Sequence, residues 1–293
     1  MKRYLVTGGA GFIGSNLVKR LVEERCEVIV IDNLSTGSKE NLPKEVPLLI
    51  GTYKEHLSLL PHIDGIFHLG IPSSTPLYRE SRLWILEALQ DSIYILEFAR
   101  GRGLRAVFAS SSSIYNGNPV PWSEDMPIFI TDFYSEVRYW MERLSTLYFD
   151  FYKVESIGLR LFSVYGRGEE AKGKFANLVT QLIWASKDGS IFSVYGNGSQ
   201  SRDLTYIDDV VNAFIISMNS PIKHGVFNIG TGRAFSLNEI ISTIGAKVEY
   251  IKNPLRNYIN QTLADTRKAR QELGFESKYS LEEGLGILRG RDW

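Results

Sequence analysis

A glycine-rich loop between a short apolar run and a helical pattern constrains the fold of this chain more than any other feature. The apolar run covers residues 4–7, and Gly9, Gly11 and Gly14 follow it with the spacing G-x-G-x-x-G. Residues 13–22 then carry apolar side chains at helical spacing. Glycines placed in this way let the backbone approach a pyrophosphate, whose charge the N–H groups at the start of a helix can bind. The sequence therefore predicts a dinucleotide-binding loop.

An acidic residue after the next apolar run indicates which dinucleotide is bound. Residues 28–31 are typical of a second strand, and Asp32 follows the glycines at close to the expected spacing of roughly 20 residues. A carboxylate at this point binds the adenosine ribose of NAD and repels the 2′-phosphate of NADP. Asn33 and Leu34 supply no arginine that would hold such a phosphate. We therefore expect NAD as the cofactor.

Short apolar runs continue to alternate with helical patterns along the first half of the chain. Further strands are predicted at residues 48–50, 66–69, 106–109 and 156–162, with a helix over 86–96. This alternation predicts an α/β fold of the Rossmann type, a doubly wound parallel sheet with helices on both faces. Ligands bind at the carboxyl ends of the strands in such sheets.

The pattern loosens after about residue 165, which suggests two lobes. We assign residues 1–165 to a NAD-binding domain and residues 166–293 mainly to a smaller, mixed α/β substrate-binding lobe. Residues 203–220 are expected to rejoin the first domain, because 208–218 read as a helix that returns to its sheet. Asp208-Asp209 indicates the start of that helix rather than a metal site. The second lobe is predicted to contain a helix around 175–185, a strand at 191–195 and a helix opened by the capping box Ser236–Glu239.

Composition excludes several classes of function. The 33 basic and 33 acidic residues balance, so no global charge favours nucleic acid. Cys26 is the single cysteine and the four histidines are scattered, so we expect no disulfide and no metal site. No apolar run approaches the roughly 20 residues of a membrane span. The apolar stretch 4–6 is too short for a signal peptide, and we expect a cytoplasmic protein.

Hydroxyl groups and a helical Tyr/Arg pair are the candidate catalytic groups. A run of four serines, residues 110–113, follows the fifth predicted strand. Tyr134 and Arg138 lie four residues apart on a predicted helix and therefore share one face. A tyrosine, with an ordinary pKa near 10, acts as a general base near neutrality only where positive charge stabilises its phenolate. Arg138 and an oxidised nicotinamide would supply that charge.

Several ordered motifs together resemble one family over nearly the whole chain, up to the closing segments 264–269 and 273–275. The family is the extended short-chain dehydrogenase/reductases, in the branch of the NAD-dependent sugar-nucleotide epimerases and most like the UDP-glucose 4-epimerases. The motifs are Thr7–Gly14, Asp32–Gly37, Phe67–Leu69, Ser110–Tyr115, Tyr134 with Glu142, Arg202–Asp209 and Asn228–Gly232.

The resemblance implies a reaction and a role for each candidate residue. Ser111 corresponds to the catalytic Ser/Thr four residues before a tyrosine, here Tyr115, and Tyr134 to the base of the Tyr-x-x-x-Lys pair. Tyr134 would take the proton of the sugar 4-hydroxyl while hydride passes from C4 to NAD. The 4-keto sugar would then turn over in the pocket, and hydride would return to its other face, so that UDP-glucose and UDP-galactose interconvert without net consumption of NAD. Ser111 would hydrogen-bond the reacting oxygen.

The resemblance also implies the binding residues and a homodimer. Arg202 corresponds to an arginine that pairs with the substrate diphosphate, with Arg256 as a second clamp, and Tyr195 falls where the family stacks an aromatic ring on uracil. The substrate-binding set is Ser111, Ser163, Tyr195, Arg202 and Arg256. The NAD-binding set is Gly8, Gly11, Phe12, Ile13, Gly14, Asp32, Asn33, Ser35, Thr36, Gly37, Tyr134 and Arg138.

Four departures from the family pattern cluster around the expected ligands. Arg138 replaces the lysine of the catalytic pair and keeps the charge, but it is bulkier and planar. Ser163 stands where the family has an asparagine, and Thr52 where it has an acid near the adenine. Ala88 replaces the asparagine before a Gly-Thr motif, and that motif itself is Asp91-Ser92. These positions indicate either a different substrate or weaker catalysis.

Other functions and simpler structural roles remain open at this point. Serines at 112 and 113 disfavour a 4,6-dehydratase, which carries an Asp-Glu pair there, and a UDP-glucuronate decarboxylase, which carries a glutamate at the second position. A reductase or dehydrogenase of the same superfamily, and a non-catalytic NAD sensor, are the alternatives. Ser111 could merely cap the next turn, Tyr195 could be core, and Arg202 could pair with Asp203 or Asp208.

Overall fold

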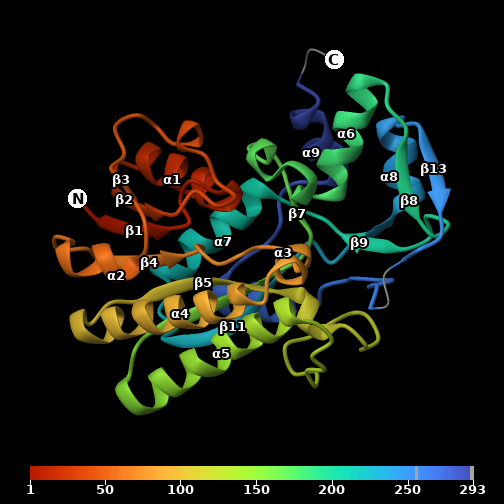
Figure 1. The fold of residues 1–293 in the computed structure, drawn as a ribbon. Coiled ribbons are helices and arrows are strands. Elements are labelled where there is room, and N and C mark those ends of the chain that lie inside the picture. The colour runs from red at the N-terminus through yellow and green to blue at the C-terminus, as the bar shows by residue number, and fades with distance from the viewer. Residues whose placement is uncertain (255–256, 291–293) are drawn as a thin grey trace.

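A seven-stranded, wholly parallel sheet forms the centre of the computed structural model, which describes residues 1–254 and 257–290 (Figure 1). The strand order is β3-β2-β1-β4-β5-β6-β11, so the predicted Rossmann-type fold is confirmed. The strands are β1 (Arg3–Thr7), β2 (Glu27–Asp32), β3 (Leu48–Ile50), β4 (Gly65–His68), β5 (Ala106–Ser111), β6 (Ser156–Leu161) and β11 (His224–Ile229).

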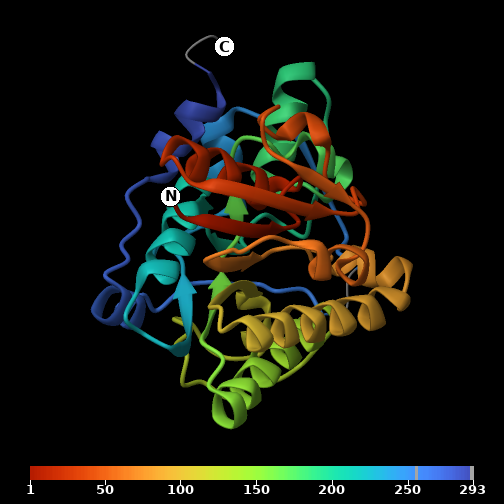
Figure 2. The ribbon, with the colours of Figure 1, turned by 90° about the vertical axis from the view of Figure 1, so that its left-hand side faces the viewer.

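Helices cover both faces of this sheet. Helices α1 (Phe12–Glu23) and α7 (Ile207–Asn219) pack together on one face, and α4 (Leu83–Arg102) and α5 (Phe133–Tyr152) pack together on the other. Figure 2 shows the strands between α1 on one side and α4 and α5 on the other. Because both faces are covered, the central strands are continuous apolar runs, as the sequence indicates. Shorter helices follow two of the strands, α2 (Tyr53–His56) and α3 (Thr75–Glu80).

The edge strand β11 is a feature that the sequence analysis did not predict. It pairs with β6 from His224 to Ile229, so the part of the chain that returns to the sheet extends beyond 203–220. Asn228 interrupts the apolar run in this strand and is fully buried. Its Oδ1 accepts a hydrogen bond from Tyr115 Oη at 2.8 Å, and its Nδ2 donates to Trp122 O at 2.9 Å. A polar residue fits in this buried strand because distant loops satisfy its amide.

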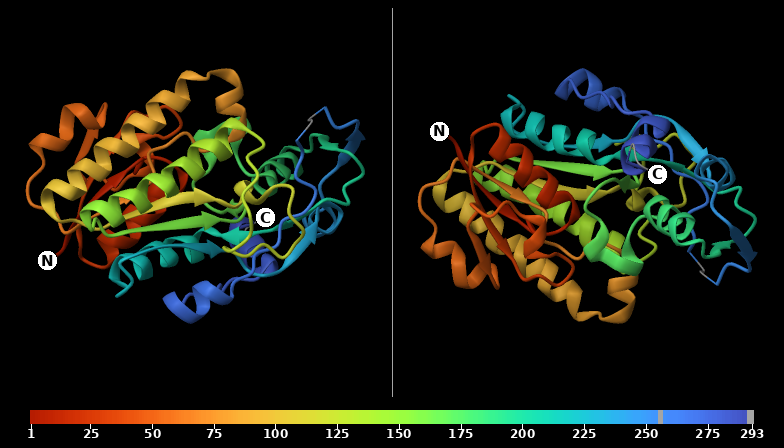
Figure 3. Two further views of the ribbon diagram at one scale, coloured as in Figure 1. Left: turned by 90° about the horizontal axis from the view of Figure 1, so that it is seen from below. Right: turned by 90° about the horizontal axis from the view of Figure 1, so that it is seen from above.

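A second group of elements lies beyond the carboxyl ends of the strands (Figure 3). Ser236 caps α8 with Glu239, as predicted. The helix expected around 175–185 begins at Leu178, because Asn177 caps it. The helices are α6 (Leu178–Asp188), α8 (Leu237–Ile244) and α9 (Leu281–Leu288), and the paired strands are β7 (Val164–Tyr165) with β10 (Thr205–Tyr206), β8 (Phe192–Tyr195) with β13 (Val248–Ile251), and β9 (Ser201–Asp203) with β12 (Ala234–Ser236).

Short 3₁₀ and π turns complete the connections. Asp208 and Asp209 lie in the first turn of α7, as predicted, and Asp209 also accepts hydrogen bonds from the backbone of Lys278 and Tyr279. The turns are η1 (Lys39–Asn41), η2 (Leu57–Leu59), η3 (Ser112–Tyr115), η4 (Glu170–Phe175) and η5 (Ala269–Leu273).

The strand order fixes where a ligand can bind. From β1 the chain proceeds outward through β2 and β3, and it then crosses to β4 on the other side of β1. The loops after β1 and β4 therefore diverge and leave a crevice at the carboxyl ends of these strands.

Candidate active site

A cavity of about 800 Å³ opens at this crevice. Its walls include residues from the first half of the chain and from the elements beyond the sheet. Of the predicted site residues it brings together Gly8, Gly11, Phe12, Ile13, Gly14, Asp32, Asn33, Ser35, Thr36, Gly37, Ser111, Tyr134, Arg138, Ser163 and Arg202.

The glycine loop packs too closely for a side chain at Gly8, Gly9 or Gly14. Gly8 has a φ of +65°, and a Cβ on Gly14 would lie 2.1 Å from Gly8 O. Helix α1 therefore starts directly on the loop, and Gly11 is its N-cap. The N–H groups of Phe12 and Ile13, in the first turn, have no acceptor within the helix. With no acidic residue in this turn, they are available to an anion.

Asp32 ends β2 against this loop. Its Oδ2 accepts a hydrogen bond from Ala10 N at 2.9 Å and its Oδ1 accepts one from Leu34 N at 2.8 Å. Burial raises the pKa of Asp32, and these backbone donors oppose the shift. Each carboxylate oxygen has a further lone pair for a hydroxyl of the cofactor. Gly37 packs against Ala10 and brings the segment after Asp32 alongside the glycine loop.

Ser111 ends β5 in the wall of the cavity. Its Oγ accepts from Ser113 N at 3.2 Å and lies 2.9 Å from Ser113 Oγ. Ser113 Oγ also accepts from Ser135 Oγ, in the first turn of α5, at 3.1 Å. Ser111 therefore does cap the turn η3, and it lines the cavity at the same time.

Tyr134 and Arg138 lie together on the cavity face of α5. The guanidinium carbon of Arg138 is 5.1 Å from the centre of the Tyr134 ring. Arg138 Nη1 donates to Ala109 O at 2.7 Å and Nη2 donates to Pro72 O at 3.2 Å. The arginine is almost fully buried and ties α5 to the segments that follow β4 and to β5.

These two contacts predict the effect of restoring the family's lysine. We expect Arg138→Lys to lower the free energy of unfolding by roughly 1–3 kcal/mol, because one ammonium cannot replace two guanidinium nitrogens and leaves a buried carbonyl unpaired. Urea denaturation measures this loss. Arg143→Lys, at an exposed position of the same helix, is the control. An Arg138→Lys variant as stable as wild type would contradict the role of these contacts.

Arg202 reaches the cavity from β9. Its guanidinium carbon lies 5.4 Å from the centre of the Tyr258 ring, and Nη1 donates to Ser201 O at 2.8 Å. Neither predicted acidic partner is used, because Asp203 accepts from the backbone of residues 231, 232 and 264, and Asp208 pairs with Arg167 at 2.9 Å. Nη1 also donates to Asn260 O at 3.3 Å. Because neither carboxylate neutralises the guanidinium, its positive charge is available to a ligand in the cavity.

Two predicted substrate residues remain, Tyr195 and Arg256. Tyr195 ends β8, which pairs with β13, and it does not line the cavity. Arg256 lies outside the described residues. Tyr258 instead presents an aromatic ring beside Arg202. No local pattern in the sequence could have indicated that Tyr258 lies beside Arg202. The two residues are 56 positions apart, and only the fold brings them together.

Other cavity residues were also missed by the sequence analysis. Lys172 lies 5.1 Å from the Phe12 ring and pairs with the buried Glu169 at 2.8 Å. Other lining residues that contribute to the charge and shape of the cavity are Arg79, Trp84, Glu87, Asn177 and Thr262.

The departures from the family pattern lie in different environments. Ser163 lines the cavity, and its backbone has a φ of +25°, which residues other than glycine rarely adopt. Thr52 also lines it, where its N–H donates to Glu55 at 2.8 Å at the start of α2. Ala88 is buried in an apolar cluster and does not line the cavity, whereas Asp91 does.

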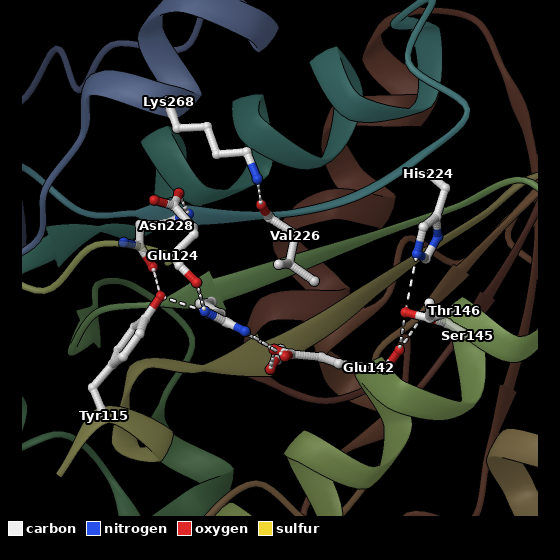
Figure 4. A network of polar contacts seen from close by, with 11 residues as sticks. Tyr115, Glu124, Glu142, Ser145, Thr146, His224, Val226, Asn228 and Lys268 are labelled. Atoms are coloured by element: carbon white, nitrogen blue, oxygen red, sulfur yellow. Dashed lines mark hydrogen bonds and ion pairs between the residues drawn. The ribbon is translucent and has the colours of Figure 1, made fainter. Parts of the chain in front are cut away.

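A buried network of ionic and polar side chains connects helix α5 to the sheet (Figure 4). Glu142 on α5 pairs with Arg160 of β6 at 2.7 Å and accepts from Ser110 Oγ at 2.5 Å. Arg160 also donates to Tyr115 Oη, which donates in turn to Asn228 of β11. The network thus joins α5, which carries Tyr134, to β5, β6 and β11.

The sheet order, the glycine loop and Asp32 together define a dinucleotide-binding protein of the Rossmann class. The chain belongs to the NAD dependent epimerase/dehydratase family, whose model matches residues 4–230. NAD is therefore the cofactor, and the tight loop, the free N–H groups of α1 and the lone pairs of Asp32 fit it. In the described ranges no cluster of three or more His, Cys, Asp or Glu residues could hold a metal ion.

The chain is similar over almost its full length to named relatives. It is 29% identical to a putative UDP-glucose 4-epimerase of Methanocaldococcus jannaschii, covering 96% of this chain and 95% of that protein. It is 32% identical to UDP-glucuronic acid decarboxylase 1 of Danio rerio, covering 97% of this chain and 71% of that protein. Its fold matches the structure of Thermus thermophilus UDP-glucose 4-epimerase in complex with NAD with a TM-score of 0.86. The two sequences are 28% identical, and the match covers 97% of this chain and 96% of that one. Among the helices that the structure describes, none is long and apolar enough to cross a membrane.

Proposed function

We propose that this protein is a nucleotide-sugar 4-epimerase that interconverts UDP-glucose and UDP-galactose. The observation that carries the proposal is that one cavity holds Ser111 and Tyr134 beside the glycine loop and Asp32. Similarity to proteins named UDP-glucose 4-epimerase supports the choice of substrate.

The residues of the chain take the following roles in this proposal. When bound, NAD supplies the acceptor and donor of hydride for C4 of the sugar. Tyr134 removes and returns the proton of the 4-hydroxyl, with the Arg138 charge 5.1 Å from its ring to stabilise the phenolate. Ser111 Oγ orients the reacting oxygen. Arg202 pairs with the diphosphate, for which arginine is suited by its several fixed donors.

Interconversion of the two nucleotide sugars tests the proposal. The protein is incubated with NAD and either UDP-glucose or UDP-galactose, and the nucleotide sugars are separated by chromatography. We expect each substrate to yield the other. If neither UDP-hexose nor any other nucleotide-hexose is converted while NAD is bound, the epimerase proposal fails and a non-catalytic NAD sensor takes its place.

Decarboxylation of UDP-glucuronate is the second candidate, because a relative at 32% identity is named for that reaction. Ser113 occupies the position at which decarboxylases carry a glutamate, and its Oγ is bound to Ser111 and Ser135. No carboxylate is therefore supplied at that position. Release of carbon dioxide from UDP-glucuronate would favour this candidate over 4-epimerisation.

We further propose that the protein is a homodimer that pairs through α4 and α5. These helices run side by side on the outside of the sheet (Figure 3). Leu86 and Ile93 of α4 and Leu147 and Phe151 of α5 are exposed, and each pair follows the helical repeat. A second copy of the same two helices would cover this apolar stripe.

Replacement of Leu147 and Phe151 with glutamate is expected to convert the dimer to a monomer. Loss of a central apolar anchor costs roughly 2 kcal/mol or more, and each substitution occurs twice in a two-fold interface. Light scattering after size-exclusion chromatography measures the mass. Leu59→Glu, at an exposed position on η2, should leave the mass unchanged. A monomeric wild type, or a double variant that remains dimeric, would contradict this interface.

A further inference from the structure

Helix α4 presents an acidic edge to the cavity on the side of Asp32. Glu87 and Asp91, four residues apart, both line the cavity. Like charges at this spacing on a helix repel each other. Glu87 Oε1 accepts a hydrogen bond from Asn33 Nδ2 at 3.2 Å, which places this edge next to the segment that follows Asp32. Asp91 is also one of the positions at which the sequence departs from the pattern that the resemblance implies.

Asp91 is partly buried, and no residue within 1–254 or 257–290 pairs with it or donates a hydrogen bond to it. Two neighbouring side chains are bound elsewhere. Tyr53 of α2 donates its hydroxyl to Gly70 O at 2.8 Å, and Arg138 of α5 is bound to two backbone carbonyls. The other titratable or charged groups that line this part of the cavity are Asp32 after the glycine loop, Lys54 of α2, Arg79 of α3, Tyr94 of α4 and Tyr134 of α5. His56 of α2 and His68 of β4 lie on the same elements as lining residues or next to them but do not line the cavity themselves.

Burial and the Glu87 charge raise the pKa of Asp91 to about 7. Two of its neighbours stay neutral across this range. Burial lowers the pKa of His68 to about 3 and raises that of Tyr53 far above its ordinary value. Asp91 can therefore change its charge near neutral pH.

The charge of Asp91 matters because NAD brings a negatively charged pyrophosphate. An ionised carboxylate without a partner in the cavity wall would repel this group. A neutral carboxylic acid does not repel it, and it has one O–H to donate.

We propose that Asp91 is a further NAD-binding residue and that it binds the cofactor as the neutral acid, donating its proton to an oxygen of NAD. NAD binding near neutral pH is then coupled to the uptake of a proton. This inference rests on NAD binding alone and does not depend on the sugar or on the reaction proposed above.

The sign of the pH dependence follows from linkage. Bound NAD holds the pKa of Asp91 above its value in the free protein. The contribution to binding is therefore complete below about pH 7, and it is lost as the pH rises towards the pKa of the complex. Over this window the dissociation constant should rise by up to about tenfold per pH unit.

Calorimetric titration of NAD into the 293-residue chain, freed of nucleotide, tests the inference between about pH 6 and pH 8.5. We expect proton uptake, measured in buffers that differ in heat of ionisation, and weaker binding at high pH. Asp91→Asn should bind NAD independently of pH, with the affinity that wild type has at low pH. Glu87→Gln removes the neighbouring charge and should move the wild-type transition to lower pH. His56→Gln, which changes the histidine of α2, should keep the wild-type profile.

Three results would overturn the inference. They are a wild-type affinity that does not depend on pH, an Asp91→Asn variant that keeps the wild-type dependence, and a His56→Gln variant that loses it. Circular dichroism at each pH shows that the variants are folded. Absence of epimerase activity would leave the titration unaffected, so failure of the proposed function and failure of this inference are distinguishable.

Discussion

Tyr134→Phe is expected to lower kcat for 4-epimerisation by about 10²–10⁴-fold, the usual contribution of a positioned general base. The phenyl ring keeps its contacts with Tyr78, whose ring centre is 5.9 Å away, and with the guanidinium of Arg138. Only the hydroxyl that would take the proton is lost. Steady-state rates with UDP-galactose measure the effect, and calorimetry should show that NAD still binds.

Tyr139→Phe is the matched control for this prediction. Tyr139 lies on the same helix, but it packs in the apolar cluster around Tyr115 and Trp122 and does not line the cavity. The kcat of the Tyr139→Phe variant should equal that of the wild type. A Tyr134→Phe variant that keeps more than about a tenth of the wild-type kcat would mean that another group is the base.

Glu142→Ala is expected to have the largest effect on stability, a loss of roughly 3–5 kcal/mol in the free energy of unfolding. The Glu142–Arg160 pair is almost fully buried, with 5% of each side chain exposed. Removal of the carboxylate leaves the Arg160 charge buried without its counterion, and Ser110 Oγ without its acceptor. Urea denaturation monitored by circular dichroism measures the change.

The exposed Arg20–Glu24 pair provides the control for Glu142→Ala. Its side chains are 53% and 37% exposed, so Glu24→Ala should change the free energy of unfolding by no more than about 0.5 kcal/mol. Equal effects of the two substitutions would contradict a structural role for the buried network.

Local patterns account for what the sequence predicted correctly. The glycine loop and Asp32 lie within one strand-helix-strand unit, where spacing alone determines which residues meet. The strands at 48–50 and 106–109 and the capping box at Ser236 are likewise properties of short segments. The sheet order follows from their alternation with helices.

Contacts between distant segments account for what the sequence could not predict. Tyr258 rather than Tyr195 lies beside Arg202, because the fold and not the spacing brings them together. Strand β11 contains Asn228, and its burial depends on partners more than 100 residues away in the sequence. The two backbone acceptors of Arg138 also come from separate segments. Each of these features requires tertiary structure that no local pattern records.

The structure indicates different roles for the two departures from the family pattern at positions 91 and 138. Arg138 keeps the positive charge beside Tyr134 and adds two hydrogen bonds that stabilise the wall of the cavity. Asp91 adds a titratable carboxyl group to the wall of the cavity. The first change is thus compatible with the proposed 4-epimerase chemistry, and the second underlies the proposed coupling of NAD binding to the uptake of a proton.

Transfer of an isotopic label shows whether hydride returns to the carbon atom that it left. UDP-galactose that carries deuterium at C4 is incubated with the protein and NAD, and the product is analysed by mass spectrometry and NMR. Our account predicts UDP-glucose that retains the deuterium at C4, with no net formation of NADH, because Tyr134 exchanges only the hydroxyl proton. Loss of the deuterium to solvent, net formation of NADH, or no conversion would contradict it.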